Sequence, residues 1–352
     1  MKTRSAFLAA LFLTCTILFA EEWRTFTDKE GRSFEGSVLS VDKEAKTFRV
    51  TVKDSGNAAT VPFGKLSGKD LEYVKKWKEP APEETTGWED SDEGDLPSSL
   101  YPRTKDEIDD RIKEIRKRPA PNGIDKLQQE TVNELNVYRY LCGVPDDVEA
   151  DKQMIKEATE AAIACKDFGG LSHDLGHFTN KVNLSTVGDI FNTPKQYIND
   201  AGANNREHRG HRRWCLNPPM GKTGFGTAGA KYSAMWAMDS SGSKIRDSWS
   251  YPGKGFFPKE FLHGNAWTLY LPGNAPPTED LTVEVFKLTT RPQKAFSSTG
   301  EIPGRALPVK FVFSYQNAIN FEPEEDPITG RGIYWVRIKG GGLREGYVVD
   351  LY

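Results

Sequence analysis

GHRRWCLNPPMGKTGFGTAGAKYSAMWAM, residues 210–238, is the stretch of sequence that decides the fold of this chain. Its last part alternates with a period of two residues, which is typical of a β-strand. A second stretch, GGLSHDLGH at 169–177, adds two histidines, and four of the five histidines lie between residues 169 and 241. If the protein has a polar site, we therefore expect it in this region.

Helical patterns surround these stretches. Apolar residues recur on one helical face over 124–141, and a second amphipathic pattern spans 150–165. Pro194 suits the first turn of a third helix over 195–200. Helices combined with period-two strands predict an α+β domain.

This part of the chain resembles the CAP superfamily of cysteine-rich secretory proteins, antigen-type venom allergens and plant pathogenesis-related proteins. The resemblance covers about 115 residues, from Asp125 to Asp239. It implies a three-layer α-β-α sandwich with a surface cleft, which we expect over 124–245. The motifs that carry it, in the family's order and spacing, are Leu135-Asn136-Val137-Tyr138-Arg139, Ser172-His173, Asn183-Leu184, Gly210-His211-Arg212, Leu216-Asn217-Pro218 and Gly224-Phe225-Gly226.

The family's cleft holds two histidines and two carboxylates, and the resemblance implies where they fall in this chain. The histidines match His173 and His211. The first glutamate falls at Val182, so that carboxylate is lost, and the second aligns best with the shorter Asp200. His173, His211 and Asp200 are therefore the candidate cleft residues, and zinc is the cofactor that imidazole and carboxylate ligands would favour.

Two other spacings could place polar groups together. His173 and His177 are four residues apart, as ligands on a helix would be, but the surrounding glycines favour a loop. Glu207, His208 and His211 would fall within one helical turn, where Glu207 and His211 equally suit a surface ion pair. Buried structural histidines remain the alternative for His173 and His211.

A small β-rich module is expected over residues 21–78, because three segments alternate like strands and a helix follows Ser67. It resembles the small SH3-like homology domain of a yeast endocytic adaptor, the SLA-type domain, which recurs in exported bacterial proteins. The resemblance implies an SH3-like β-barrel and a protein or peptide partner; a purely structural barrel is the alternative. The matching residues are Trp23-Arg24, Asp28, Gly31-Arg32, Val61-Pro62, Lys65-Leu66-Ser67, Asp70 and Tyr73-Val74.

Two further regions complete the expected multidomain organisation. Residues 79–123 are acidic and contain prolines, which predicts a linker, with one short helix after the capping box of Thr104 and Glu107. Residues 246–352 carry about seven short strands between Gly- and Pro-rich turns, which predicts a C-terminal β-sandwich.

The N-terminus predicts export. Lys2 and Arg4 precede an apolar run that ends near Ala20, which indicates a signal peptide over 1–20 and a secreted, periplasmic or cell-envelope protein. No membrane-spanning segment is expected after cleavage, and an uncleaved anchor is the alternative. The pairing of Cys142, Cys165 and Cys215 stays open, since three cysteines leave at least one unpaired and all could be buried thiols.

The leading functional hypothesis is an exported, non-catalytic binding protein whose ligand is a peptide, glycan or lipid. A formal net charge of -3 does not suggest nucleic acid. The alternative is a metal-dependent hydrolase that uses His173, His211 and Asp200, although the chain lacks the Gly-x-Ser-x-Gly and His-Glu-x-x-His motifs. A third hypothesis is a cell-envelope scaffold with a vestigial cleft.

Overall fold

The chain divides into two compact units, residues 1–91 and 92–352. The predicted signal peptide over 1–20 and residues 79–95 of the predicted linker lie outside the described residues. None of the described helices is long and apolar enough to cross a lipid bilayer. The structure, a computed structural model, describes residues 24–43, 46–53, 58–77, 96–200, 202, 205–324 and 331–352.

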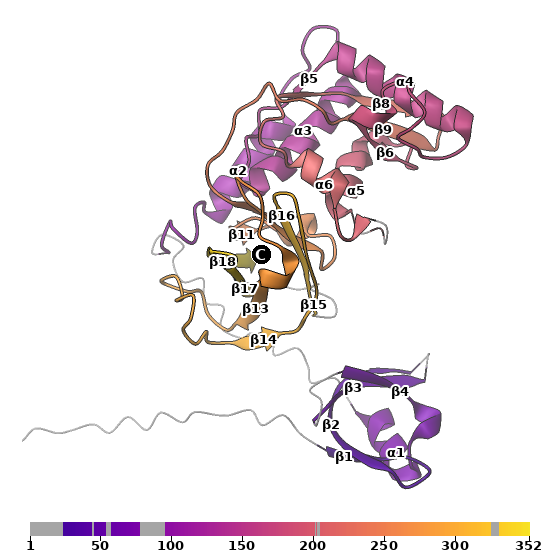
Figure 1. Cartoon of the computed structure of the whole chain (residues 1–352), viewed down its shortest axis with the longest axis vertical. Coiled ribbons are helices and arrows are strands. Elements are labelled where there is room, and N and C mark those ends of the chain that lie inside the picture. Colours follow the sequence, from indigo (N-terminus) through magenta and orange to yellow (C-terminus); the bar gives the residue numbers. More distant parts are fainter. Residues whose placement is uncertain are drawn as a thin grey trace, which may run out of the picture. The chain divides into compact units, whose positions relative to one another are not determined.

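The N-terminal unit is an antiparallel sheet followed by a helix (Figure 1). Its strands lie in sequence order and are β1 (Arg24–Thr27), β2 (Ser33–Asp42), β3 (Thr47–Val52) and β4 (Ala58–Pro62). A short 3-10 helix η1 (Phe63–Lys65) leads into α1 (Gly68–Lys76). The core of this unit consists of Phe26, Phe48, Val50, Phe63, Leu66 and Val74.

The sheet of this unit is not a closed barrel, which corrects the expected SH3-like barrel. No pairing between β1 and β4 exists among the described residues. Instead, the segment before α1 runs along β1: Ser67 N–H donates to Thr27 O at 2.9 Å, and Lys29 N–H donates to Lys65 O at 3.0 Å. The backbone groups at the end of β1 are thus satisfied by a loop rather than by β4.

The second unit begins with helices and a small sheet. The helices are α2 (Lys105–Arg116), α3 (Lys126–Leu141), α4 (Lys152–Phe168), α5 (Thr193–Asn199) and α6 (Gly210–Cys215). The three-stranded antiparallel sheet has the order β6 (Val182–Ser185), β9 (Tyr232–Trp236) and β8 (Phe225–Ala228). Two short parallel strands, β5 (Glu149–Ala150) and β7 (Lys222–Thr223), form a separate pair.

Helices pack on both faces of the three-stranded sheet. On one face α4 lies along β8 and β9, where its alanines meet Val182 and Trp236 in a separate core (Figure 1). On the other face Phe225 and Met235 join the core that contains α3, Tyr197 of α5 and residues of α6. The alternation of strand side chains therefore divides β8 and β9 between two cores.

The described part of the predicted linker belongs to this unit. Thr104 caps α2 together with Glu107, as the capping-box pattern predicts. The buried face of α2, which includes Ile108 and Ile115, packs against α3.

The C-terminal strands form two further sheets. The first has the order β10 (Trp249–Tyr251), β12 (Trp267–Tyr270), β16 (Ala318–Pro323) and β15 (Val309–Tyr315). The second has the order β11 (Gly255–Phe257), β18 (Leu343–Leu351), β17 (Gly332–Gly340), β13 (Thr282–Leu288) and β14 (Arg305–Leu307). One continuous core joins both sheets to α2 and α3. The protein is thus a mixed α/β molecule with several sheets.

Candidate functional site

Asp200 and His211 come together at the junction of α5 and α6. Asp200 ends α5 in a left-handed conformation (φ 41°), and only 1% of its side chain is exposed. Its Oδ1 lies 3.1 Å from His211 Nδ1 and accepts from Asn205 Nδ2 at 2.8 Å. Its Oδ2 accepts from the backbone N–H groups of His211 at 3.0 Å and Arg212 at 3.3 Å. Both carboxylate oxygens are therefore used by neighbouring donors.

These contacts keep Asp200 ionised. Burial alone would raise its pKa, but hydrogen bonding and charge from His211, with the charge of Arg212, outweigh burial and lower the pKa below its ordinary value. Since the ionised carboxylate can only accept, Nδ1–H of His211 donates the hydrogen bond to Asp200 Oδ1. The Nε2 atom of this partly exposed ring is then left as its second polar atom.

His173 is held by a backbone carbonyl instead of a carboxylate. Its Nδ1 lies 2.6 Å from Thr179 O, and since a carbonyl oxygen only accepts, Nδ1 is the donor. The ring is exposed, as is that of His177, whose φ of 46° is left-handed. Residues 171–178 form turns rather than a helix, so the four-residue spacing does not place these two rings on one helical face.

Glu207 and His208 lie on the surface before α6, which begins at Gly210. The helical spacing considered for Glu207 and His211 therefore does not apply, and His211 pairs with Asp200 instead. The ring of His208 packs against Tyr315, with 4.2 Å between ring centroids.

A zinc centre at the candidate cleft does not fit this geometry. Nowhere in the described parts do three or more His, Cys, Asp or Glu side chains gather as a metal would require. Both oxygens of Asp200 accept hydrogen bonds, and Val182 is buried in the core beside α4. Asp200 orients His211, as an outer-shell carboxylate does, but does not offer an open ligand.

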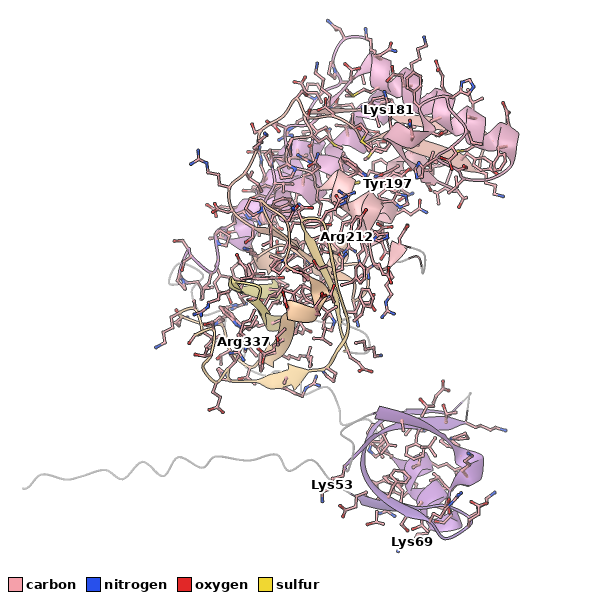
Figure 2. All side chains as sticks on the ribbon, viewed as in Figure 1. Lys53, Lys69, Lys181, Tyr197, Arg212 and Arg337 are labelled. Carbon is pink, nitrogen blue, oxygen red and sulfur yellow. The ribbon has the colours of Figure 1, made fainter. Side chains whose placement is uncertain are left out.

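The Gly-His-Arg motif also has a structural role. Arg212 is fully buried and donates to Asn199 O at 2.8 Å, Ala266 O at 2.7 Å and Thr268 Oγ1 at 2.9 Å. In Figure 2 it lies where the helical part of this unit meets the C-terminal strands. The nearby Arg209 donates to Glu322 of β16 at 2.5 Å. The motif therefore connects two layers of the unit.

The three cysteines behave as buried thiols. Cys142, Cys165 and Cys215 are all buried and unpaired with one another. Burial raises the pKa of Cys142 to about 12 and raises that of Cys215 further, which disfavours the reactive thiolate. No nucleophilic cysteine is therefore placed beside His211.

A concave surface also lies in the N-terminal unit. A pocket of about 500 Å³ has an apolar floor formed by Phe63 and Leu71. Four lysines surround this floor: Lys29, Lys43, Lys46 and Lys75. They come from the β1–β2 turn, the β2–β3 turn and α1.

The frame of this pocket, hereafter the lysine pocket, is hydrogen-bonded. Phe63 N–H donates to Lys46 O at 2.9 Å, and Lys29 N–H donates to Lys65 O. All four lysine side chains are exposed, and none forms an ion pair with another described residue. No sequence motif pointed to this set, because lysines in turns are ordinary and only folding brings three separate segments together.

No protein-family model, curated protein or solved structure matches this chain. The functional argument therefore rests on the geometry of the Asp200–His211 pair and of the lysine pocket.

Proposed function

We propose that this protein is an exported, non-catalytic binding protein whose N-terminal unit captures a short acidic peptide in the lysine pocket. The observation that carries the proposal is the pocket itself: four exposed lysines without ion-pair partners among the described residues surround an apolar floor. The signal-peptide pattern over 1–20 supports export. The SLA-type resemblance agrees with a peptide ligand.

The chemistry of the pocket selects the ligand. The four positively charged lysines attract an acidic partner and speed its encounter with the pocket. This attraction is stronger at low salt than at high salt. Phe63 and Leu71 offer apolar surface to one aromatic or aliphatic side chain of the ligand. A peptide that carries Asp and Glu around one such residue satisfies both requirements.

The second unit supports binding rather than catalysis. We take residues 124–245 of this unit to be a CAP-type domain, since helices on both faces of a small sheet agree with that resemblance. Its Asp200–His211 pair lacks a nucleophile held by His211 and lacks the further ligands of a metal centre among the described residues. A metal-dependent hydrolase is therefore the less favoured function.

Fluorescence anisotropy with a labelled peptide of Asp and Glu around one Phe tests the proposal. We expect the full chain to bind it, and the Lys43→Gln/Lys46→Gln variant to bind about tenfold more weakly, since each exposed ion pair contributes up to about 1 kcal/mol. Lys69→Gln is the matched control, because Lys69 is an exposed lysine of the same unit, labelled in Figure 2, that does not line the pocket.

Two outcomes would contradict this function. One is equal binding of a peptide in which Gln and Asn replace Glu and Asp. The other is equal weakening by Lys69→Gln and by the double substitution, which would indicate nonspecific attraction to positive charge.

A further inference from the structure

A second pocket, of about 180 Å³, lies within the 92–352 unit, at a place where no site was expected from the sequence. Three segments supply most of its lining: Arg116 at the end of α2, Glu134 and Tyr138 of α3, and Phe191, Asn192 and Lys195 around the start of α5. Glu260 and Phe261 of the short 3-10 helix η6 (Lys259–Phe261) also line it. We call it the four-segment pocket.

The aromatic wall of this pocket is fixed by packing and hydrogen bonds. Tyr138 meets Phe261 edge to face, with 5.4 Å between ring centroids, and its hydroxyl lies 2.8 Å from His263 Nε2. The hydroxyl of the buried Tyr251 donates to Phe261 O at 3.0 Å and accepts from His263 N–H at 2.7 Å. The η6 segment is thus held in place, so this wall is preformed.

The four charged side chains of the pocket differ in whether they already form an ion pair within the protein. Arg116 and Glu134 satisfy each other through two hydrogen bonds of 2.6 and 2.9 Å. Lys195 and Glu260 are exposed at the rim, and neither forms an ion pair with another described residue. Two positive and two negative side chains give the pocket no net charge. The charge of Glu260 also acts on Arg116, but neither Lys195 nor Glu260 is held in an ion pair with another described residue, so both can face a ligand.

We propose that the four-segment pocket binds a small zwitterion, an α-amino acid with an apolar side chain. Its carboxylate would face Lys195, its ammonium group would face Glu260, and its side chain would lie against Phe261 and the half-exposed Phe191. Opposite charges at the rim complement a dipolar ligand better than a simple anion or cation. The volume is below the range of about 300–1,000 Å³ that larger ligands occupy, which suits a single amino acid.

Ligand-observed NMR on the full-length protein tests this inference with L-leucine and L-phenylalanine as probes. Isoamylamine and 4-methylvalerate are leucine without its carboxylate and without its ammonium group, and we expect both to bind more weakly than leucine. Lys195→Gln and Glu260→Gln should each weaken binding of the amino acids about fivefold, as expected for one partly exposed charge pair. Lys259→Gln is the control, since Lys259 is exposed beside Glu260 but does not line the pocket.

Three results would overturn the inference. The first is the absence of binding of both amino acids up to roughly 10 mM, beyond the millimolar weak end of specific binding. The second is binding that neither rim substitution changes. The third is equal binding of leucine and of either single-charge analogue. The lysine pocket lies in the other unit, so none of these results depends on the peptide experiment.

Discussion

The surroundings of His263 alter its acid–base behaviour. Burial, together with the positive charges of Lys195 and Arg212, lowers its pKa to about 4. In the unfolded chain its pKa returns to the ordinary value of about 6.5. Between these two values the unfolded state therefore binds a proton that the folded state does not bind.

This difference predicts that the 92–352 unit loses stability as the pH falls from about 6.5 to about 4. The free energy of unfolding should drop by at most about 1.4 kcal/mol per pH unit from this group. His263→Gln keeps a hydrogen-bonding partner for Tyr138 but does not titrate, so we expect it to flatten the slope. Urea unfolding at pH 7 and pH 5 measures the effect.

The exposed His208 supplies the control for this measurement. His208→Gln also removes one histidine, at an exposed position against Tyr315, but retains His263, so the loss of stability assigned to His263 should persist in it. Asp200 acts in a separate range: its pKa is lowered, so its contribution is present above its ordinary value of 3.8 and is lost only in more acidic solution. An unchanged slope in His263→Gln would contradict the assignment to His263.

At the scale of elements, the Gly-Phe-Gly motif of the 210–238 stretch has a packing explanation. A Cβ atom on Gly224 would lie 2.2 Å from the backbone N of Ile155, and one on Gly226 would lie 2.1 Å from that of Thr159. Both neighbours belong to α4, which lies directly on this strand. Phe225 between them faces the opposite core. Glycine is thus required for the close approach of α4 to β8.

Gly226→Ala should therefore separate α4 from β8. The methyl group would meet backbone rather than a flexible side chain, so we expect the free energy of unfolding to fall by about 3 kcal/mol, at the upper end for overpacked sites. Gly210→Ala is the control, because a Cβ there meets nothing within 4 Å, and its effect should stay below about 1 kcal/mol. Similar losses in both variants, measured by denaturant unfolding, would refute this explanation.

Local elements followed from the sequence because local rules determine them. The helix expected over 124–141 is α3, and the Thr104–Glu107 capping box starts α2. The missing barrel closure did not follow, because it depends on which backbone takes the edge of β1, and that is a contact between Thr27 and Ser67. The two pockets were likewise hidden, since each combines segments distant in sequence.

The candidate site was predictable only in part. The resemblance placed Asp200 and His211 among the site residues, and the structure does bring these two together. It could not show that both oxygens of Asp200 are used by neighbouring donors, because Asn205 and the backbone of α6 supply those donors only after folding. The burial of Arg212, next to His211, could not be predicted from the sequence either, since a charged residue is ordinarily exposed.

At the scale of the whole molecule, the two units have separate cores. The N-terminal core is small, whereas one core in the second unit runs from α2 and α3 into both C-terminal sheets. Buried arginines strengthen this continuity: Arg212 donates to Ala266 and Thr268, and Arg209 pairs with Glu322. We therefore expect two unfolding transitions, with the helical layer and the C-terminal sheets unfolding together.

Glu322→Gln tests this expectation by calorimetry. The substitution removes the anion beside Arg209, whose side chain is only 1% exposed. The more exposed Arg206, which lies 2.6 Å from Glu322, loses the same partner. Breaking a buried pair by removing one partner costs about 3–5 kcal/mol, and partial exposure of Glu322 should reduce this to about 2 kcal/mol. The transition of the 92–352 unit should then shift to lower temperature as a whole, and that of the N-terminal unit should not move.

Glu279→Gln, at an exposed position outside this ion pair, is the control and should change neither transition. If Glu322→Gln instead splits the larger transition in two, the helical layer and the C-terminal sheets are separate cooperative units, and Glu322 is a contact between them rather than part of one core.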